Sequence, residues 1–267
     1  MCSILTVKTR PGELVELFPA LLDPEGVDGL GAELRVHGYL KKELAPVIFS
    51  DGDGTLQVRK KYFSLCPDWA KRWPFEFETY NARLSRPKRN KDSSSQNSLF
   101  SDERSEPIVN ENILSVPSFR DPFRRGQTCL VPLTGAVESC YFGESAGHVV
   151  RFTLADESLI FAAGLWNDWV NIATGEVIPT FTLLTDDPDP IVFRNGHDRG
   201  LVVLNSEAWK QWLLERKMSG QDRLSFVRKN RIEPAWVARA ERALKNGWQK
   251  RAPSPSDISQ MKVWSGS

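Results

Sequence analysis

A series of short, β-prone runs separated by turn signals constrains the fold of this chain most. The series lies between Gln127 and Asn205 and consists of QTCLVPL, AVESCYF, HVVRFTL, LIFAAGLW, PTFTLLT and LVVLN. Closely spaced runs of this kind are typical of antiparallel sheets that bend or close on themselves. We predict that HVVRFTL and LIFAAGLW pair as a hairpin across the turn ADES.

Helical patterns flank this series on both sides. PGELVELFPALL (11–22) has apolar residues at helical spacing and precedes a predicted hairpin, APVIFSDGDGTLQVRKKYF. The segment SEAWKQWLLERK follows the strands, with Asn205 or Ser206 as its N-cap. EPAWVARAERALKNGW (233–248) has Pro234 near its first turn and Gly247 at its end, which predicts a last helix. The fold class expected is α+β, with a strongly bent or barrel-like, mainly antiparallel sheet and peripheral helices.

The composition changes sharply between Arg86 and Pro117. The stretch RPKRNKDSSSQNSLFSDERSEP is polar, rich in serine and almost without aliphatic side chains, so it cannot bury enough surface to order itself. We therefore expect a long surface insertion or mobile loop at about 86–117. The domain organisation expected is a catalytic domain over 1–213 and a C-terminal helical extension over 214–267, packed on the same domain.

Composition and charge exclude few classes. Lys+Arg 35 against Asp+Glu 34 gives a net charge of +1 over 267 residues, which neither demands nor excludes nucleic acid. The longest apolar stretch is far too short to cross a bilayer, and no signal peptide precedes it. The four cysteines show no CxxC spacing and the histidines are only three. We expect no metal, no cofactor, no membrane contact, a monomer, and a cytoplasmic protein, nucleoid-associated if bacterial.

The chain begins with Met1 and Cys2. Methionine aminopeptidase removes Met1 when the next side chain is small, which would leave Cys2 with a thiol and a free α-amine two carbons apart. An α-amine has a reference pKa of about 7.7–8.0 and a thiol about 8.5, so a useful fraction of each is nucleophilic near neutral pH. An interior cysteine cannot offer this pair.

Four stretches in order resemble the SOS response-associated peptidase (SRAP) family of abasic-site-processing proteins. They are MC at the start, NAR (81–83), CLVPLTGAVES (129–139) and GHDRGLVVL (196–204). YFSLCPDWAK and IFAAGLWNDW agree more weakly. The resemblance covers roughly residues 2–213, and each motif is short, so its specificity lies in the ordered set. The chain departs from the family pattern after the cysteine (Ser3, Ile4), after NAR (Leu84, Ser85, Arg86), beside Glu138 (Ala136, Val137, Ser139) and at Leu201.

The resemblance implies a chemistry for the aminoterminal pair. The open aldehyde form of an abasic deoxyribose condenses with the amine of Cys2, and the thiol then closes a thiazolidine ring. Glu138 is the implied proton donor and acceptor, which also assists removal of Met1 and reversal of the cross-link. His197 is implied to exchange a proton or contact a phosphate. Asn81 is implied to orient the amine.

Arginines beside these motifs are candidates for binding the DNA backbone. Arg83 is expected to clamp the phosphate beside the lesion. Arg199 is expected either to contact the backbone or to pair with Asp198. For His37 and His148 we expect no special role.

Basic and aromatic residues also interleave ahead of the motifs, a mixture that holds single-stranded DNA. They are Lys60, Lys61, Tyr62, Phe63, Trp69, Lys71, Arg72, Trp73, Arg120, Arg124 and Arg125. Phe63 and Trp69 are the predicted stacking residues, and Arg124 and Arg125 predicted phosphate contacts. Trp166 and Trp212 are expected in the core.

The function expected is therefore an abasic-site sensor that cross-links covalently to single-stranded DNA, with Met1 removal and lyase-type activity. Two other readings stay open. An N-terminal cysteine also begins the N-terminal-nucleophile glutamine amidotransferases, in which the α-amine activates its own thiol. The altered residues around Glu138 and Leu201 also suit a non-catalytic DNA-binding relative.

Overall fold

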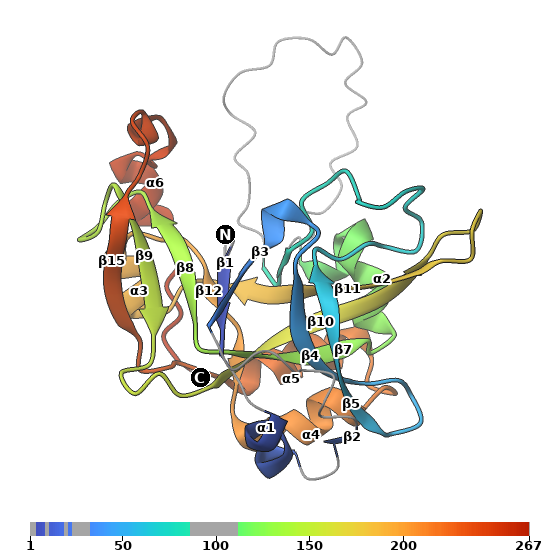
Figure 1. Cartoon of the computed structure of the whole chain (residues 1–267). Helices are drawn as coiled ribbons and strands as arrows, with labels where there is room; N and C mark the ends of the chain where they lie inside the picture. The colour runs from blue at the N-terminus through green and yellow to red at the C-terminus, as the bar shows by residue number, and fades with distance from the viewer. Residues whose placement is uncertain (1–3, 9–10, 19–20, 23–32, 86–111, 267) are drawn as a thin grey trace, which may run out of the picture.

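The computed structural model describes residues 4–8, 11–18, 21–22, 33–85 and 112–266. Five strands form a closed ring in which each pairs with two others (Figure 1). In ring order these are β11 (Val177–Asp186), β5 (Leu56–Phe63), β4 (Leu44–Ser50), β7 (Thr128–Leu133) and β10 (Ile160–Val170). Only the β11–β5 contact in this ring is parallel. The expected barrel-like, mainly antiparallel sheet is confirmed.

Short strands extend the ring at its margins. β2 (Leu21–Leu22) pairs with β5, and β6 (Asn81–Arg83) and β12 (Gly200–Leu201) pair with β11. β13 (Val203–Leu204) pairs with β10 and with β14 (Arg231–Ile232).

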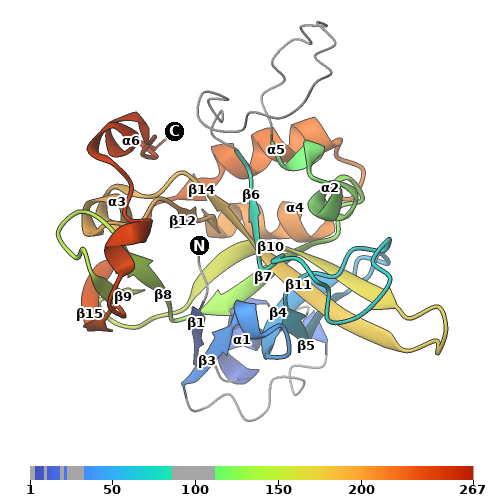
Figure 2. The ribbon, with the colours of Figure 1, turned by 90° about the horizontal axis from the view of Figure 1, so that it is seen from above.

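A second sheet of five antiparallel strands stands beside the barrel (Figures 1 and 2). Its order is β15 (Val237–Ala243), β9 (His148–Thr153), β8 (Gly135–Cys140), β1 (Ile4–Val7) and β3 (Leu34–His37). The chain passes from barrel strand β7 into β8 through Thr134, whose N–H donates to the carbonyl of Thr6 at 2.9 Å. This bend joins the two sheets.

Alternate side chains of the barrel strands enter two different apolar clusters, as expected for strands buried on both faces. One cluster fills the barrel and continues to the second sheet; it includes Phe49, Phe63, Cys129, Val131, Trp166 and Phe181. The other lies beneath the helices and includes Ile48, Leu130, Ala163, Phe123, Trp212 and Leu224. The predicted core positions of Trp166 and Trp212 are confirmed.

Within the described residues, the short α-helices lie at the periphery: α1 (Pro11–Leu17), α2 (Pro117–Arg124), α3 (Pro190–Asn195), α4 (Ser206–Leu214), α5 (Gly220–Lys229) and α6 (Pro255–Gln260). The same part of the chain contains the 3-10 turns η2 (Gly38–Leu40), η3 (Ile113–Ser115) and η4 (Trp248–Arg251). The side chain of Asn205 accepts a hydrogen bond from the N–H of Ala208, so Asn205 is the N-cap of α4. Within the described residues no helix is long and apolar enough to cross a membrane.

Three predicted elements are wrong. The segment 233–248 is not a helix, because its residues pair with the open edge of β9 as strand β15; tertiary pairing overrides their helix propensity. The extension over 214–267 is therefore not only helical. β9 pairs with β8 and β15 rather than with β10. The helix predicted over 11–22 ends at Leu17, and β2 follows it.

The predicted insertion lies largely outside the described residues. Its two ends meet, because Ser85 and Asn112 form an isolated β-bridge. Residues after Asn112 belong to the fold: Ile113 is fully buried, and Asn112 accepts a hydrogen bond from the N–H of Leu114. The C-terminal part of the predicted insertion, 112–117, was therefore wrongly assigned to it.

Candidate functional site

Glu138 occupies the middle strand of the second sheet. β8 lies between β1 and β9, and Glu138 shares the barrel-facing side of β8 with Ala136 and Cys140. Its side chain is almost fully buried, at 5% exposure. Among the six residues of β8, only Ser139 is partly exposed. A buried carboxyl group of this kind is a candidate proton donor and acceptor.

His197 is brought against Glu138 by the turn that follows α3. Gly196 ends α3 with φ +105°, a conformation that glycine adopts without strain. The Nε2 atom of His197 lies 3.5 Å from Oε2 of Glu138, and its Nδ1 atom lies 3.1 Å from the carbonyl oxygen of Ser139. Both side chains are at least nine-tenths buried.

These contacts determine which ring nitrogen of His197 carries a hydrogen. Because a carbonyl can only accept, Nδ1 of His197 must carry a hydrogen, and Nε2 then faces Glu138 with its lone pair. Burial lowers the pKa of His197, although the neighbouring Glu138 raises it. The imidazole is therefore neutral near pH 7. Nε2 of the neutral imidazole therefore faces Oε2 of Glu138 at 3.5 Å, and both atoms belong to buried side chains.

Asn81 and Arg83 lie on β6, which runs parallel to β11 with Asn81 opposite Leu183. β12 pairs with the opposite edge of the same β11 segment, so that Arg83 and Leu201 lie on either side of Thr185. Arg83 forms an ion pair with Asp187 at 3.0 Å. Arg199 lies 3.7 Å from Asp198, so the predicted pairing within this motif is present. These cations are partly buried rather than extended into solvent.

The charge of Glu138 reaches several of these groups. Burial lowers the pKa of Arg199, and Asp198 and Glu138 oppose that shift. Burial also raises the pKa of Tyr80, and Glu138 adds to the rise. The structure thus brings Glu138, His197, Arg199 and the Tyr80–Arg83 segment into one electrostatic neighbourhood. Asn81, Glu138 and His197 were predicted from three separate motifs.

Cys2 lies outside the described residues. The other three cysteines are buried, and burial raises the thiol pKa of Cys66 and Cys140 to about 12 and that of Cys129 further. Such thiols are poor nucleophiles at neutral pH. Cys66, Cys129 and Cys140 are therefore unsuited to act as nucleophiles, and Cys2 stays the predicted one.

Two predicted strand-binding residues are in the wrong environment. Phe63 is 0% exposed and stacks on Phe181 with ring centroids 4.9 Å apart, so its expected stacking on a base is wrong. Lys61 is also buried, 2.5 Å from Asp168 and 4.3 Å from the ring centre of Phe49. The alternation of β5 turns both side chains into the barrel.

Trp69, Arg124 and Arg125 remain at the surface. Trp69 is 49% exposed, and its indole N–H donates to the carbonyl of Pro117 at 3.3 Å. Arg124 is exposed, and Arg125 forms an exposed ion pair with Asp68 at 2.8 Å. These three belong to the neighbourhood of α2 and the 64–80 segment.

An exposed apolar surface near Tyr80 was missed from the sequence. Tyr39 and Leu40 on η2 and Phe77 are each about half exposed. Lys41 holds the two segments together, since its Nζ donates to the carbonyls of Phe75, Glu76 and Phe77 at 2.7, 3.2 and 3.0 Å. The run HGYLKK carries no periodicity that marks its apolar residues as exposed, so only the structure reveals this surface.

A buried ion pair anchors α3, the helix that delivers His197. Oδ1 of Asp189 lies 2.7 Å from Nη2 of Arg231, and Oδ2 accepts from the indole N–H of Trp236 at 2.9 Å. Burial raises the pKa of Asp189, and Arg231 opposes the rise. Trp264 covers Arg231 with its ring at 4.7 Å, so the C-terminal tail closes over this pair.

Replacing Asp189 with alanine is expected to lower the free energy of unfolding by about 3–5 kcal/mol, because Arg231 would be left buried without its counter-charge. Urea denaturation followed by circular dichroism measures this loss. The matched control is Glu76→Ala, which removes an exposed partner of Arg72 and should cost less than about 1 kcal/mol. An unfolding midpoint of Asp189→Ala equal to that of the wild type would contradict the anchoring role.

Among the residues that the structure describes, no group of three or more His, Cys, Asp or Glu side chains could hold a metal ion.

The chain belongs to the family described as SOS response-associated peptidase (SRAP), whose sequence profile matches residues 87–240. This membership places it among DNA-damage-associated, peptidase-like proteins. No curated protein matches the sequence. The family match extends through residue 240 in β15, beyond residue 213, to which the predicted resemblance reached.

Solved structures share the fold. A protein from Bacteroides thetaiotaomicron is 19% identical, with a TM-score of 0.63 over 98% of this chain and 100% of that chain. A protein from Bordetella bronchiseptica is 20% identical, with a TM-score of 0.61 over 90% and 100%. A phage-related protein from the same organism is 15% identical, with a TM-score of 0.53 over 90% and 94%. At these identities the likeness concerns the fold alone.

Proposed function

We propose that the mature protein forms a covalent cross-link to abasic sites in single-stranded DNA through the amine and thiol of Cys2. The observation that carries the proposal is the buried Glu138–His197 pair. Glu138 lies on β8, which pairs with β1. Ile4 of β1 pairs with Val137, the residue next to Glu138. The chain therefore enters the fold beside a group that can exchange a proton.

Covalent geometry keeps Cys2 within reach of this pair. Cys2 precedes Ile4 by two residues, which span about 7 Å at full extension. Ile4 itself lies in register one residue from Glu138 on the neighbouring strand. The amine and thiol are thus tethered within a short radius of the proposed proton donor, which raises their effective concentration there.

The reaction balances without a cofactor. The amine of Cys2 attacks C1 of the ring-opened deoxyribose, and loss of the carbonyl oxygen gives an imine. The thiol then adds to the same carbon, so one C–N and one C–S bond form. The oxygen leaves as water with one hydrogen from the amine and one from the thiol. Glu138 supplies a proton to the departing oxygen and accepts one in return, with His197 holding it between steps.

The same carboxyl group is suited to two further steps. Hydrolysis of the Met1–Cys2 bond frees the amine, and reversal of the thiazolidine releases the DNA; both require proton transfer at this end of β8. We therefore include self-removal of Met1 and lyase-type activity in the proposal. General proteolysis is not part of it.

The exposed apolar and aromatic surface suits an unpaired strand. Tyr39, Leu40, Trp69 and Phe77 offer side chains on which bases can stack, and such stacking is tolerant of sequence. Arg83 and Arg199 carry positive charge beside Glu138. A phosphate group can exchange with Asp187 or Asp198 as the partner of these arginines.

A denaturing gel tests the proposal. Purified protein is incubated with a single-stranded oligonucleotide carrying one abasic site, with the undamaged oligonucleotide as the matched control. We expect a heat-stable shifted band with the abasic strand only. Mass spectrometry should show that Met1 is absent and that the adduct mass equals protein plus oligonucleotide minus one water.

Two outcomes would contradict the proposal. Retention of Met1 together with tight binding of undamaged DNA would support a non-catalytic relative, because a blocked amine cannot condense. Glutamine hydrolysis without any DNA adduct would support the amidotransferase reading.

A further inference from the structure

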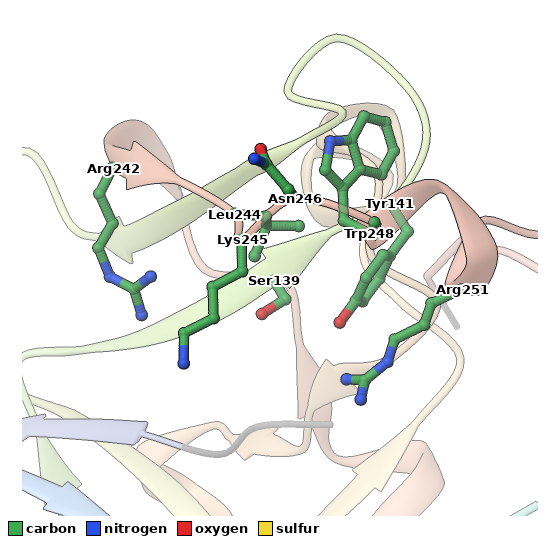
Figure 3. A pocket seen from close by; sticks show the side chains of 9 residues that line it. Ser139, Tyr141, Arg242, Leu244, Lys245, Asn246, Trp248 and Arg251 are labelled. Atoms are coloured by element: carbon green, nitrogen blue, oxygen red, sulfur yellow. The ribbon is translucent and has the colours of Figure 1, made fainter.

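A basic, aromatic-walled pocket lies at the C-terminal end of the second sheet, where β8 meets the segment after β15 (Figure 3). Its volume is about 410 Å³, within the size range of pockets that hold small organic ligands. Ser139 and Tyr141 come from the end of β8, whereas Arg242, Lys245, Trp248 and Arg251 come from the last part of the chain. The pocket therefore exists only because the C-terminal segment docks on this sheet.

The docking of that segment is specific. The N–H of Leu244 donates to the carbonyl of Gly147 at 2.7 Å. Gly147 has φ +82°, and a Cβ built on it would lie 2.8 Å from the indole ring of Trp248. Only glycine at this turn allows Trp248 to sit so close, and the half-buried indole is thereby fixed as a wall of the pocket.

The register of the sheet turns the pocket residues to one face. Ser139 and Arg242 are both paired with Val149, on opposite sides of β9, so they share a face of the sheet. Figure 3 shows the side chains of Arg242, Lys245 and Arg251 extending in the same direction, with Tyr141 beside Arg251. Three cations and two rings thus border one hollow.

The three cations have no acidic partner within the part of the chain that the structure describes. Other arginines of the same sheet do: Arg35 pairs with Glu241 at 2.6 Å, and Arg151 pairs with Glu33. Positive side chains gathered without counter-charges next to an indole and a phenol suit a ligand that carries both a phosphate and a flat ring. A nucleotide has this combination, since its phosphate meets the cations and its base stacks on the ring.

We propose that this pocket binds a nucleotide of the DNA strand outside the lesion, so that the C-terminal segment holds the strand while Cys2 reacts. The inference rests on the proposed function for the identity of the strand. One main-chain link joins the two sites: the carbonyl of Ser139, a pocket residue, accepts the hydrogen bond from His197. The pocket therefore lies across β8 from the candidate proton-transfer pair, on the opposite face of the strand.

The test measures affinity for undamaged DNA, which needs no covalent step. The double variant Lys245→Ala/Arg251→Ala is titrated with a fluorescent oligothymidylate of about 12 nucleotides, long enough for one binding surface of this size. We expect the dissociation constant to rise at least tenfold. The logarithm of the association constant falls with the logarithm of the salt concentration. The steepness of this fall should decrease by about 1.4, because each lost phosphate contact on a single strand removes about 0.7.

Matched variants keep charge and folding controlled. Lys250→Ala removes a cation from η4, the same turn as Arg251, but Lys250 does not line the pocket. The affinity of this variant for the oligonucleotide should therefore stay within about twofold of that of the wild type. Trp248→Ala should weaken binding about tenfold, whereas Trp248→Phe keeps a ring and should lose less. If Lys250→Ala weakens binding as much as the double variant, general charge rather than the pocket holds DNA, and the inference is wrong.

A free nucleotide is the other source of the same chemistry. Thymidine monophosphate is titrated in parallel, and we expect it to bind far more weakly than the oligonucleotide. Equal affinities would overturn the assignment of a DNA strand to this pocket. The two proposals fail separately: a wild type that forms no abasic adduct refutes the cross-linking function, whereas an adduct-forming wild type whose double variant binds undamaged DNA normally refutes only the pocket.

Discussion

Replacing Cys2 with serine is expected to abolish the heat-stable adduct with abasic DNA, with a loss of at least 100-fold in band intensity. Serine keeps the α-amine, so the imine still forms, but its hydroxyl group is a far weaker nucleophile than a thiol and does not close the ring. Treatment with borohydride reduces the imine to an amine that cannot hydrolyse. The band of Cys2→Ser should therefore return only when borohydride is present, as read on a denaturing gel.

The control is Cys66→Ala, since the buried Cys66 thiol has a pKa of about 12 and should not react. Its adduct should form as in the wild type. A heat-stable adduct of Cys2→Ser without borohydride would mean that another side chain traps the sugar, and the proposed mechanism would then be wrong.

Replacing Glu138 with glutamine is expected to slow adduct formation and reversal by about 100-fold, the low end of what a positioned proton donor supplies. Glutamine has nearly the same shape, and its amide N–H can donate to Nε2 of His197, so the contact across 3.5 Å survives. The amide cannot give up a proton to the leaving oxygen. Single-turnover time courses on denaturing gels give both rates.

A surface glutamate beside the same sheet provides the comparison. Glu144 follows β8 and lies 3.7 Å from Arg194, with both side chains exposed. Glu144→Gln should leave both rates unchanged. If Glu138→Gln forms and reverses the adduct at wild-type rates but binds undamaged DNA much more weakly, Glu138 acts in binding and not in proton transfer.

The fold class could be predicted because the sequence shows both the hydrophobic period of helices and that of strands. The hairpin over 45–63 is present as β4 and β5, and the Asn205 cap begins α4. Strands buried on both faces, such as IFAAGLW in β10, still read as apolar runs. The helix predicted over 233–248 is wrong because its local helix signals are outweighed by pairing with β9, which lies far away in the sequence.

Some residues of the candidate site could also be predicted from the sequence, whereas the surroundings of others could not. The ordered motifs alone led to the prediction of Cys2, Asn81, Glu138 and His197, and the structure places two of these, Glu138 and His197, 3.5 Å apart. The sequence could not tell that Phe63 and Lys61 point into the barrel, that Tyr39 and Phe77 are exposed, or that Arg242, Lys245 and Arg251 border one pocket.

The sequence by itself thus determined the fold class and supplied the motifs from which Cys2 and the other candidate site residues are predicted. Only the tertiary structure decided that His197 faces Glu138, which side chains reach the surface, and how the C-terminal segment meets β8. The reason is physical: periodicity and residue chemistry act over a few neighbours, whereas burial, register across sheets and the pKa of His197 depend on contacts between residues far apart in the chain.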